Sequence, residues 1–589
     1  MKKVIIIFGV VVILAILYIV YLFIPNNKVI VAYSGQVTQL VIGGKIVESP
    51  DPPVIENEQV LLPIDAIKKY FDETIYWDEK KKKVIITTKN KVIKMNTDKS
   101  TAYVNNKPIE LNLTAKVIAD VVYLPMEDFL KDIFKIDVVY DKKNNVVVID
   151  YSENVKWTGE VIVKNVEIRK DMSIKAPIVK KVKEGDKLWL FEEYERWYKV
   201  RSEDGILGYI KKEYLKKIAV TSSVYTEEET NSLNRLLKGK LNLVWHYIYN
   251  KTPDMSKEPK IEGLDIISPT WFELEGTEGD VVNKADLNYV KWAKRNGYQV
   301  WALFSNHFES DGGKRKLTLK DKRDMTSQIL NDSEMREKVI KRVLVYTKLY
   351  KLDGINIDFE NMYKKDKDMF SQFIRELAPL LREEGVVVSV DVGVPDGSEE
   401  YSLCYDRKAL AKAVDYVMVM AYDQHYATDR VSGSVAQYSW VEKKIKRTLE
   451  EVPASKLILG LPLYTREWEE EVDNDGKMIG KPKSKVYSMD NIRKEINKNN
   501  AKVQWDENSG QFYAEYRKEN RVYKIWLEEE TSINLKSSLV HKYGLAGAAS
   551  WKKGFETSET WAVLNSNLKK NLNYLEWAQH NNSMKYKYE

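Results

Sequence analysis

The sequence predicts an α/β protein whose largest part is a parallel eight-stranded (β/α)8 barrel, a TIM barrel, between about residues 238 and 575. Two observations support this prediction. From residue 240 onward, strand-like runs alternate with helical stretches, which is the pattern of a parallel α/β architecture. The runs number eight, as the barrel requires, and occupy residues 241–247, 263–269, 299–305, 354–360, 386–392, 416–422, 457–462 and 547–551.

The predicted barrel is longer than the roughly 250 residues typical of this fold. The excess lies between the seventh and eighth strands, where residues 503–526 alternate between apolar and polar side chains like an antiparallel hairpin. We therefore expect an α+β insertion at about residues 465–540. Insertions that follow the strands of such a barrel lie over its active face, so this one should deepen that face into a groove.

The chain begins with a candidate membrane anchor, residues 1–25. Residues 4–24 form an unbroken apolar run behind Lys2 and Lys3, long enough to cross about 30 Å of hydrocarbon as a helix. No small-x-small cleavage site follows, which argues against a cleaved signal peptide. We expect the amino terminus inside, because of the two lysines, and all remaining residues on the extracytoplasmic side. A buried helix of a soluble domain is the alternative.

Residues 36–151 contain an internal repeat: the segment 61–67 recurs at 123–129, and the segment 77–86 recurs at 140–149. Each copy reads as a proline-started short helix, a strand, an Asp/Lys turn and a second strand. Two copies predict one α+β stalk domain in which each half covers the other.

Residues 157–218 change to short strands with glycine-bearing turns, which predicts a small β-barrel. Its aromatic side chains could bind glycan or peptide, although in small barrels most such residues fill the core. These side chains are Trp189, Tyr194, Trp197 and Tyr198.

Composition narrows the function. At 589 residues the chain is too long for one core. The net charge of +6 is small against 93 basic and 87 acidic side chains. It mildly favours binding to an anionic surface such as a cell wall, but it does not predict binding to nucleic acid. A single cysteine, Cys404, excludes an intramolecular disulfide, and five scattered histidines argue against a zinc hydrolase. We expect neither metal nor cofactor.

One strand carries the clearest functional signal. Residues 353–360 read Asp-Gly-Ile-Asn-Ile-Asp-Phe-Glu, and successive side chains of a strand point to opposite faces. One face is then apolar, and the other carries Asn356, Asp358 and Glu360. The next predicted helix, 369–382, has an apolar stripe that must pack on the apolar face, which argues against an edge strand in water. Buried polar side chains are costly unless something binds or reacts there, so we predict a functional site.

These residues resemble a known signature. Asp-x-x-Asp-x-Asp-x-Glu on the fourth strand of a TIM barrel is typical of glycoside hydrolase family 18, the chitinase-like enzymes. The chain matches at Asp353, Asp358 and Glu360 but has Asn356 at the second position. It looks most similar to the bacterial branch that includes spore-cortex N-acetylglucosaminidases. Residues 36–151 resemble the stalk domain named after the amino-terminal region of copper amine oxidases, without copper ligands such as histidine, and residues 157–218 resemble bacterial SH3-type domains.

Two further strand ends fit the resemblance. The sixth strand ends Met420-Ala421-Tyr422-Asp423, similar to the Met-x-Tyr-Asp of the family, and the eighth ends at Trp551, which matches the tryptophan beneath the sugar. The resemblance implies catalytic roles for Glu360, Asp358 and Tyr422. It implies substrate-binding roles for Asn356, Asp353, Met420, Asp423 and Trp551.

The implied chemistry is substrate-assisted. Glu360 protonates the glycosidic oxygen, and a raised pKa would keep it protonated near neutral pH. Asp358 lies on the same strand face, so it cannot readily act as the nucleophile across the ring. The family instead uses the 2-acetamido oxygen of the substrate, with Asp358 on the acetamide N–H and Tyr422 on its oxygen. Because Asn356 cannot ionise, Asp358 should ionise more readily, unless a nearby Asp or backbone amide compensates.

The leading prediction is a membrane-anchored glycosidase that cuts β-1,4 bonds after N-acetylglucosamine in peptidoglycan or a related glycan. Two alternatives use the same barrel: a non-catalytic glycan-binding protein and a structural adhesion protein. The presence of Glu360, Asp358 and Tyr422 together favours the enzyme. Chitin and peptidoglycan are not separated by the sequence, although the wall-type modules and the anchor favour peptidoglycan. The oligomeric state stays open.

Overall fold

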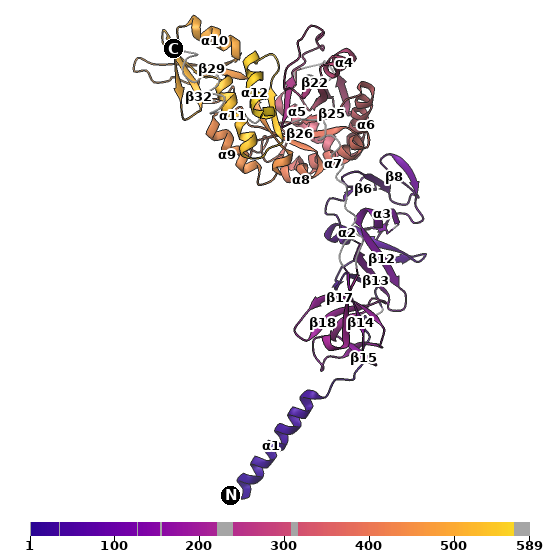
Figure 1. Cartoon of the computed structure of the whole chain (residues 1–589). Coiled ribbons are helices and arrows are strands. Elements are labelled where there is room, and N and C mark those ends of the chain that lie inside the picture. The colour runs from indigo at the N-terminus through magenta and orange to yellow at the C-terminus, as the bar shows by residue number, and fades with distance from the viewer. Residues whose placement is uncertain are drawn as a thin grey trace. The chain divides into compact units, whose positions relative to one another are not determined.

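The computed structural model describes residues 2–33, 36–126, 128–152, 156–220, 239–307 and 316–570. It divides into two compact units (Figure 1). The first comprises residues 1–86 and 93–230, and the second comprises residues 87–92 and 231–589.

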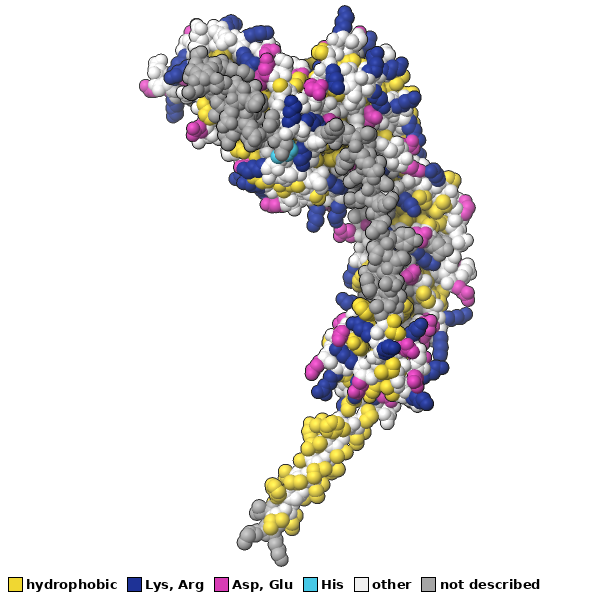
Figure 2. Space-filling model, in the orientation of Figure 1, with side chains coloured by type: hydrophobic (Ala, Val, Ile, Leu, Met, Phe, Trp, Pro, Cys, Tyr) yellow, Lys and Arg dark blue, Asp and Glu magenta, His cyan; other side chains and the backbone are white. Residues whose placement is uncertain are grey.

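The amino-terminal helix α1 spans Lys2–Phe23. Its segment Ile5–Phe23 has a mean hydropathy of 3.2 and is not buried against any part of the protein. In Figure 2 it stands out as a rod covered by hydrophobic side chains. The prediction of one apolar amino-terminal helix is confirmed, and by length and composition this helix can cross a membrane.

The stalk domain is built on the repeat. The first copy contains β4 (Gln59–Pro63), α2 (Ile64–Tyr70), β5 (Tyr76–Asp78) and β6 (Lys83–Thr87), and the second contains β11 (Val121–Pro125), α3 (Asp128–Phe134), β12 (Ile136–Asp141) and β13 (Val146–Tyr151). The two copies pair antiparallel through β4 and β11, with Leu62 opposite Leu124. Side chains of both copies share one core, so each half covers the other as expected. The remaining strands are β1 (Gln39–Ile42), β2 (Lys45–Val47), β3 (Val54–Glu56), β7 (Val92–Asn96), β8 (Thr101–Val104), β9 (Lys107–Glu110) and β10 (Lys116–Ile118).

The SH3-like region is a seven-stranded antiparallel sheet in the order β16-β15-β19-β18-β17-β14-β20. Its aliphatic core includes Val166, Ile168 and Val200. Tyr198 packs against this core, and Trp189, Tyr194 and Trp197 are half-buried. The strands are β14 (Lys156–Val161), β15 (Val166–Arg169), β16 (Ile178–Val182), β17 (Lys187–Glu193), β18 (Trp197–Ser202), β19 (Leu207–Lys211) and β20 (Leu215–Val220), with the 3-10 turn η1 (Lys212–Tyr214) before β20.

The second unit contains the barrel. Eight parallel strands follow one another around it in chain order, and β34 pairs with β21 to close it. The TIM-barrel prediction is therefore confirmed. The second strand begins later than expected and runs on to Glu275, because its last four residues pair antiparallel with β23 (Asp280–Asn283). The barrel strands are β21 (Leu241–His246), β22 (Ile266–Glu275), β24 (Gln299–Ser305), β25 (Gly354–Asp358), β26 (Val387–Gly393), β27 (Tyr416–Met420), β28 (Leu457–Pro462) and β34 (Gly547–Trp551).

Helices surround these strands (Figure 1). The predicted helix 369–382 lies within α7 (Lys367–Glu383), and the ring of Phe359 stacks on Phe370 and Phe373 of α7, both at 5.6 Å between centroids. The strand of the motif is thus covered on its outer face, as its sequence predicted. The other helices are α4 (Leu287–Arg295), α5 (Leu319–Asn331), α6 (Ser333–Tyr350), α8 (Arg407–Ala413), α9 (Tyr438–Thr448), α11 (Glu530–Lys542) and α12 (Ser558–Lys570), with the 3-10 turns η2 (Lys364–Asp366) and η3 (Ala454–Lys456).

The insertion between β28 and β34 is larger than the predicted hairpin. It is a five-stranded antiparallel sheet in the order β30-β29-β33-β32-β31, together with the helix α10 (Met489–Lys498). One residue separates β28 from β29, so the insertion rises from the carboxyl end of the barrel. Its last strand, β33, ends at Trp526, and α11 packs on β28 and α12 of the barrel. The strands are β29 (Tyr464–Glu471), β30 (Lys483–Ser488), β31 (Lys502–Asp506), β32 (Gln511–Lys518) and β33 (Arg521–Trp526).

Candidate active site

The polar face of β25 points into the carboxyl end of the barrel. Asn356 is fully buried, Asp358 is the last residue of the strand, and Glu360 lies two residues beyond it. The polar side chains of the motif therefore run from the buried interior to the mouth, while Ile355 and Ile357 are buried on the opposite face. This is the arrangement that strand alternation predicts.

The backbone of Glu360 is held by a side chain that the sequence reasoning missed. The buried Asn306, directly after β24, accepts a hydrogen bond from the Glu360 N–H at 2.9 Å and donates one to the Glu360 carbonyl at 2.9 Å. Its amide also donates to the hydroxyl of Thr326 on α5 at 3.1 Å. The position of Glu360 is thus fixed by the neighbouring strand and by α5. The sequence offered one indication of this role: Asn306 directly follows the predicted strand 299–305.

A cavity of about 330 Å³ lies at this end of the barrel, and the side chain of Glu360 opens into it. Glu360 as a whole residue is exposed at the mouth of the barrel, whereas its carboxyl group is desolvated by the surrounding protein. This desolvation, and secondarily the nearby carboxylate of Asp423, raises the pKa of Glu360 to about 7. Residues that line the cavity include Tyr247, Glu273, Ser305, Asn306, His307, Asp358, Tyr401 and Trp551.

A third carboxyl joins the cluster from the next strand. Asp391 on β26 is 1% exposed and accepts a hydrogen bond from the amide of Asn356 at 2.8 Å. Burial and the charge of Glu360 raise its pKa well above the ordinary range. The sequence could have identified Asp391 by the same alternation, because Ser389 and Asp391 are polar residues in an otherwise apolar strand.

Asp391 bears on the expectation for Asp358. Burial, the charge of Glu360 and the charge of Asp391 raise the pKa of Asp358 well above the ordinary range. The expectation that asparagine at position 356 lets Asp358 ionise more readily stays a prediction, and Asp391 on the adjacent strand supplies a second carboxyl beside Asp358. The alternative of a compensating nearby Asp agrees with this arrangement.

The residues after β27 also gather at the mouth. Met420 is the last residue of β27. Burial first, and then Tyr464 and the carboxyl groups of the cluster, raise the pKa of Tyr422 well above its ordinary value. Asp423 accepts hydrogen bonds from the Tyr464 hydroxyl at 2.7 Å and from Arg466 at 3.1 Å. Both partners belong to β29. The insertion therefore reaches the site by holding Asp423, whereas the residues that line the described cavity come from elsewhere in the barrel.

Trp551 ends β34 beside the cavity. Its ring centroid lies 6.1 Å from that of Trp245 and 6.2 Å from that of Tyr247. Lys552, the next residue, places its ammonium 4.6 Å from the Tyr247 ring. Trp551 thus lies among aromatic side chains at the end of the eighth strand, and its role beneath a sugar stays a prediction.

Asp353 is not brought together with the others. It precedes β25, accepts a hydrogen bond from the Val300 N–H at 2.9 Å and pairs with Lys294 at 3.2 Å. The same pattern recurs at Asp265 and Asp415, which also precede barrel strands and accept from a backbone N–H of the neighbouring strand. Asp353 therefore joins strands at the amino end of the barrel, away from Glu360, and does not reach a substrate in this cavity.

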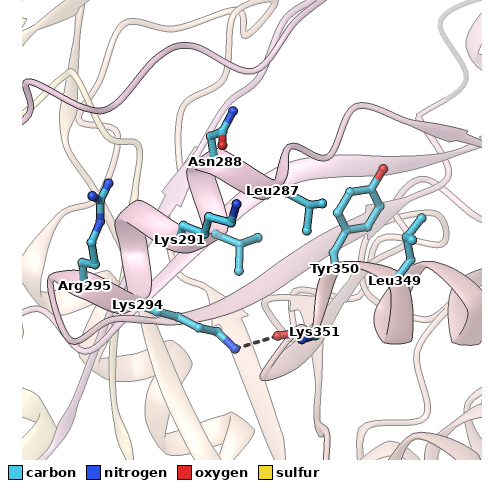
Figure 3. Close-up of a pocket in the computed structure, with 9 residues that line it drawn as sticks. Leu287, Asn288, Lys291, Lys294, Arg295, Leu349, Tyr350 and Lys351 are labelled. Atoms are coloured by element: carbon cyan, nitrogen blue, oxygen red, sulfur yellow. Dashed lines mark hydrogen bonds between the residues drawn. The ribbon is translucent and has the colours of Figure 1, made fainter.

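A larger hollow of about 850 Å³ lies between α4 and α6 in the outer helical layer (Figure 3). Lys294 reaches across it to the Lys351 carbonyl at 2.7 Å, and its other polar lining side chains are Asn288, Lys291, Arg295 and Tyr350. Its lining contains no carboxyl group, so it lacks the acid that glycoside chemistry needs. Within the described ranges, no group of three His, Cys, Asp or Glu side chains is arranged to hold a metal ion.

Comparison with known proteins agrees with this geometry. Residues 320–556 match the model of glycosyl hydrolases family 18, residues 41–149 that of the copper amine oxidase N-terminal domain, and residues 164–216 that of the bacterial SH3 domain. An uncharacterized glycosylase of Bacillus subtilis is 25% identical over 314 residues, which are 52% of this chain and 85% of that protein. The cortical fragment-lytic enzyme of Bacillus subtilis is 26% identical over 242 residues, 40% of this chain and 54% of that enzyme.

Two solved structures are similar at lower identity. A chitinase from Chromobacterium violaceum is 21% identical and superposes with a TM-score of 0.48 over 56% of this chain and 99% of that chain. The Bacillus megaterium spore cortex-lytic enzyme is 20% identical, with a TM-score of 0.48 over 60% of this chain and 77% of that chain. The chain thus spans about half the length of the cortical fragment-lytic enzyme and 85% of the uncharacterized glycosylase.

The parallel barrel, the carboxyl cluster at its mouth and the family match over residues 320–556 are the features of a glycosidase. Within that class, the barrel is similar to the glycosyl hydrolases of family 18, whose model it matches over residues 320–556.

Proposed function

We propose that the protein is a membrane-anchored glycosidase that cleaves β-1,4 bonds next to N-acetylglucosamine in peptidoglycan. The observation that carries this proposal is Glu360: its backbone is clamped by Asn306, its side chain opens into the cavity, and its pKa is about 7. A carboxylic acid of this kind keeps its proton near neutral pH and can deliver it to a leaving oxygen.

The nucleophile follows from where the other carboxyl groups lie. Asp358 shares the polar face of the β25 segment with Glu360, and Asp391 stands on the adjacent strand β26. Retaining enzymes of the ordinary kind need a carboxylate across the ring. Glu273 also lines the cavity, but it pairs with Lys284 at 3.3 Å. We propose that the 2-acetamido oxygen of the substrate attacks the anomeric carbon instead.

Each remaining residue has a role in this scheme. Glu360 donates its proton to the glycosidic oxygen as the bond breaks, and then accepts a proton from the water that opens the cyclic intermediate. Asp358 accepts a hydrogen bond from the acetamide N–H and stabilises the positive charge. Tyr422 donates to the acetamide oxygen, and Trp551 supports the sugar. Asn356, Met420 and Asp423 shape and hold the site, Asn356 through Asp391 and Asp423 through β29.

The choice of peptidoglycan rests on the rest of the chain. Residues 41–149 and 164–216 match modules of stalk and bacterial SH3 type, and two relatives are named cortical fragment-lytic enzyme and spore cortex-lytic enzyme. We propose that residues 1–25 anchor the chain with its amino terminus inside. The stalk (36–151), the SH3-like domain (157–218) and the barrel (238–575) then lie on the wall side.

Product analysis tests the proposal. The full chain in detergent is incubated with peptidoglycan and with chitin oligomers, and the new reducing ends are identified by mass spectrometry. We expect N-acetylglucosamine reducing ends from peptidoglycan, first formed as the β-anomer, and about 10²–10⁴ times slower release from Glu360→Gln. If the wild type binds either glycan as tightly as Glu360→Gln does and releases no product, the non-catalytic glycan-binding alternative replaces the enzyme.

A further inference from the structure

Asp391 is a buried carboxyl that the scheme above uses only as a neighbour. In the parallel pairing of β25 with β26, Asn356 lies opposite Ser389 and Ile357 opposite Val390, so the next positions bring Asp358 beside Asp391. Paired positions on adjacent strands point to the same face. The two carboxyl groups therefore share the interior of the barrel. One oxygen of Asp358, Oδ1, is buried without a hydrogen-bond partner among the described residues.

The hydrogen bonds around Asn356 fix the direction of its amide. The indole N–H of Trp245 donates to Asn356 Oδ1 at 2.8 Å, and an indole nitrogen can only donate. The amide nitrogen must then face the other way, where it donates to Asp391 Oδ1 at 2.8 Å and to the Ser389 hydroxyl at 3.1 Å. Asp391 Oδ1 is therefore an acceptor, and any proton that Asp391 carries sits on Oδ2.

We propose that Asp391 is a positioning residue that shares one proton with Asp358, supplying from β26 the second carboxyl that the chain lacks at Asn356. This inference rests on the proposed function. The ionisable groups that face Asp391 are Asp358 and Glu360 from the β25 segment and Tyr422 from the end of β27. Two buried carboxyl groups side by side cannot both ionise, so the pair holds one proton and one negative charge.

The proton moves within the pair during catalysis. Before the reaction it is shared between an oxygen of Asp358 and Oδ2 of Asp391. As positive charge develops on the substrate, the proton passes wholly to Asp391, and Asp358 faces the acetamide N–H as a full anion. The pair keeps its proton and its charge throughout. Glu360 alone exchanges a proton with the leaving oxygen and the incoming water.

An exchange of side chains tests this role. Asp391→Asn keeps an acceptor for the Asn356 amide, so the fold should survive, but it cannot take a proton. The double variant Asn356→Asp/Asp391→Asn moves the carboxyl to position 356 and keeps both hydrogen bonds. Trp245 still donates to the carboxylate introduced at position 356, and the bond between positions 356 and 391 only reverses its direction. We expect kcat on an N-acetylated glycan to fall about 10²-fold in Asp391→Asn with KM nearly unchanged, and to recover in the double variant to within about tenfold.

A second measurement needs no turnover. In the Glu360→Gln protein, infrared spectroscopy should detect the carbonyl stretch of one protonated carboxyl group, that of the Asp358–Asp391 pair, near neutral pH. This band should be absent when Asp391→Asn is added to Glu360→Gln. If the wild type cleaves no glycan but the band behaves in this way, the shared proton stands and the proposed function fails. Wild-type kcat in Asp391→Asn, or an unchanged band, overturns the role of Asp391. Loss of activity in Asp391→Asn without recovery in the double variant also overturns it, because a merely structural carboxyl would give that result.

Discussion

The charge on Asp423 should set part of the alkaline limit of activity. Asp423→Asn keeps the oxygen that accepts from Tyr464 and Arg466 but removes the negative charge that helps raise the pKa of Glu360. The pKa of Glu360 rises from 4.5 to about 7, an increase of about 2.5, and burial is the larger of its two causes. Asp423 therefore supplies less than half of this increase, and because Glu360 is exposed at the barrel mouth, solvent screening reduces its share further, to less than about one pH unit.

The sign follows from the role of Glu360 as a proton donor. Activity is lost as pH rises through the pKa of Glu360, so a lower pKa moves the basic limb of the profile to lower pH. The assay is kcat/KM against pH on an N-acetylglucosamine oligosaccharide, since this ratio reports the free enzyme. Asp415→Asn is the matched control: it removes the same charge just before β27, at the opposite end of the strand, and should leave the basic limb in place. A basic limb in Asp423→Asn that stays in place or moves upward would refute this account of Glu360.

Further predictions follow from single contacts. Glu360→Gln should lower turnover by about 10²–10⁴ while leaving glycan binding intact, as measured by initial rates and a pull-down on peptidoglycan. De-N-acetylated substrate should not be cleaved; cleavage would identify another nucleophile, with Glu273 the first candidate. Asn306→Ala should lower kcat by about 10–10²-fold, because both hydrogen bonds to the Glu360 backbone are lost, and an unchanged kcat would show that the clamp is dispensable. Asp353→Asn should lower the free energy of unfolding by about 1 kcal/mol, seen as a lower thermal midpoint, and leave kcat unchanged. A loss of kcat would show that Asp353 does act in the site.

The strands of the barrel could be predicted because each has a nearly continuous apolar run between turns. The second strand was the exception, since its start at Ile266 and its extension to Glu275 depend on pairing with β23, which no local pattern showed. The insertion was underestimated for a related reason. Its strand β29 carries arginine and several glutamates that are neutralised across the sheet, as in the pair of Glu470 with Lys524 at 2.7 Å, so it does not alternate like a half-buried strand.

The site shows the limit of reading one strand at a time. Asp358 and Glu360 could be placed because they share a face of β25, whereas Asn306 and Asp391 act from β24 and β26 and meet them only through the register of the sheet. Asp353 was misassigned for the converse reason: it belongs to the motif in sequence but stands at the other end of the strand, where Asp265 and Asp415 make the same contact. A motif fixes distance along the chain and says nothing about which end of the strand a residue reaches.

The missing carboxyl at position 356 shows what the sheet adds. Taken alone, Asn356 predicts that Asp358 has one carboxyl neighbour fewer to interact with electrostatically. In the barrel, the indole of Trp245 turns the Asn356 amide toward Asp391, so the neutral residue directs a neighbouring carboxyl instead of carrying one. What the chemistry needs is a second carboxyl within reach of Asp358, and parallel strands in register offer two positions for it. Asn356 and Asp391 occupy these positions in one order, and the exchanged variant asks whether the opposite order works as well.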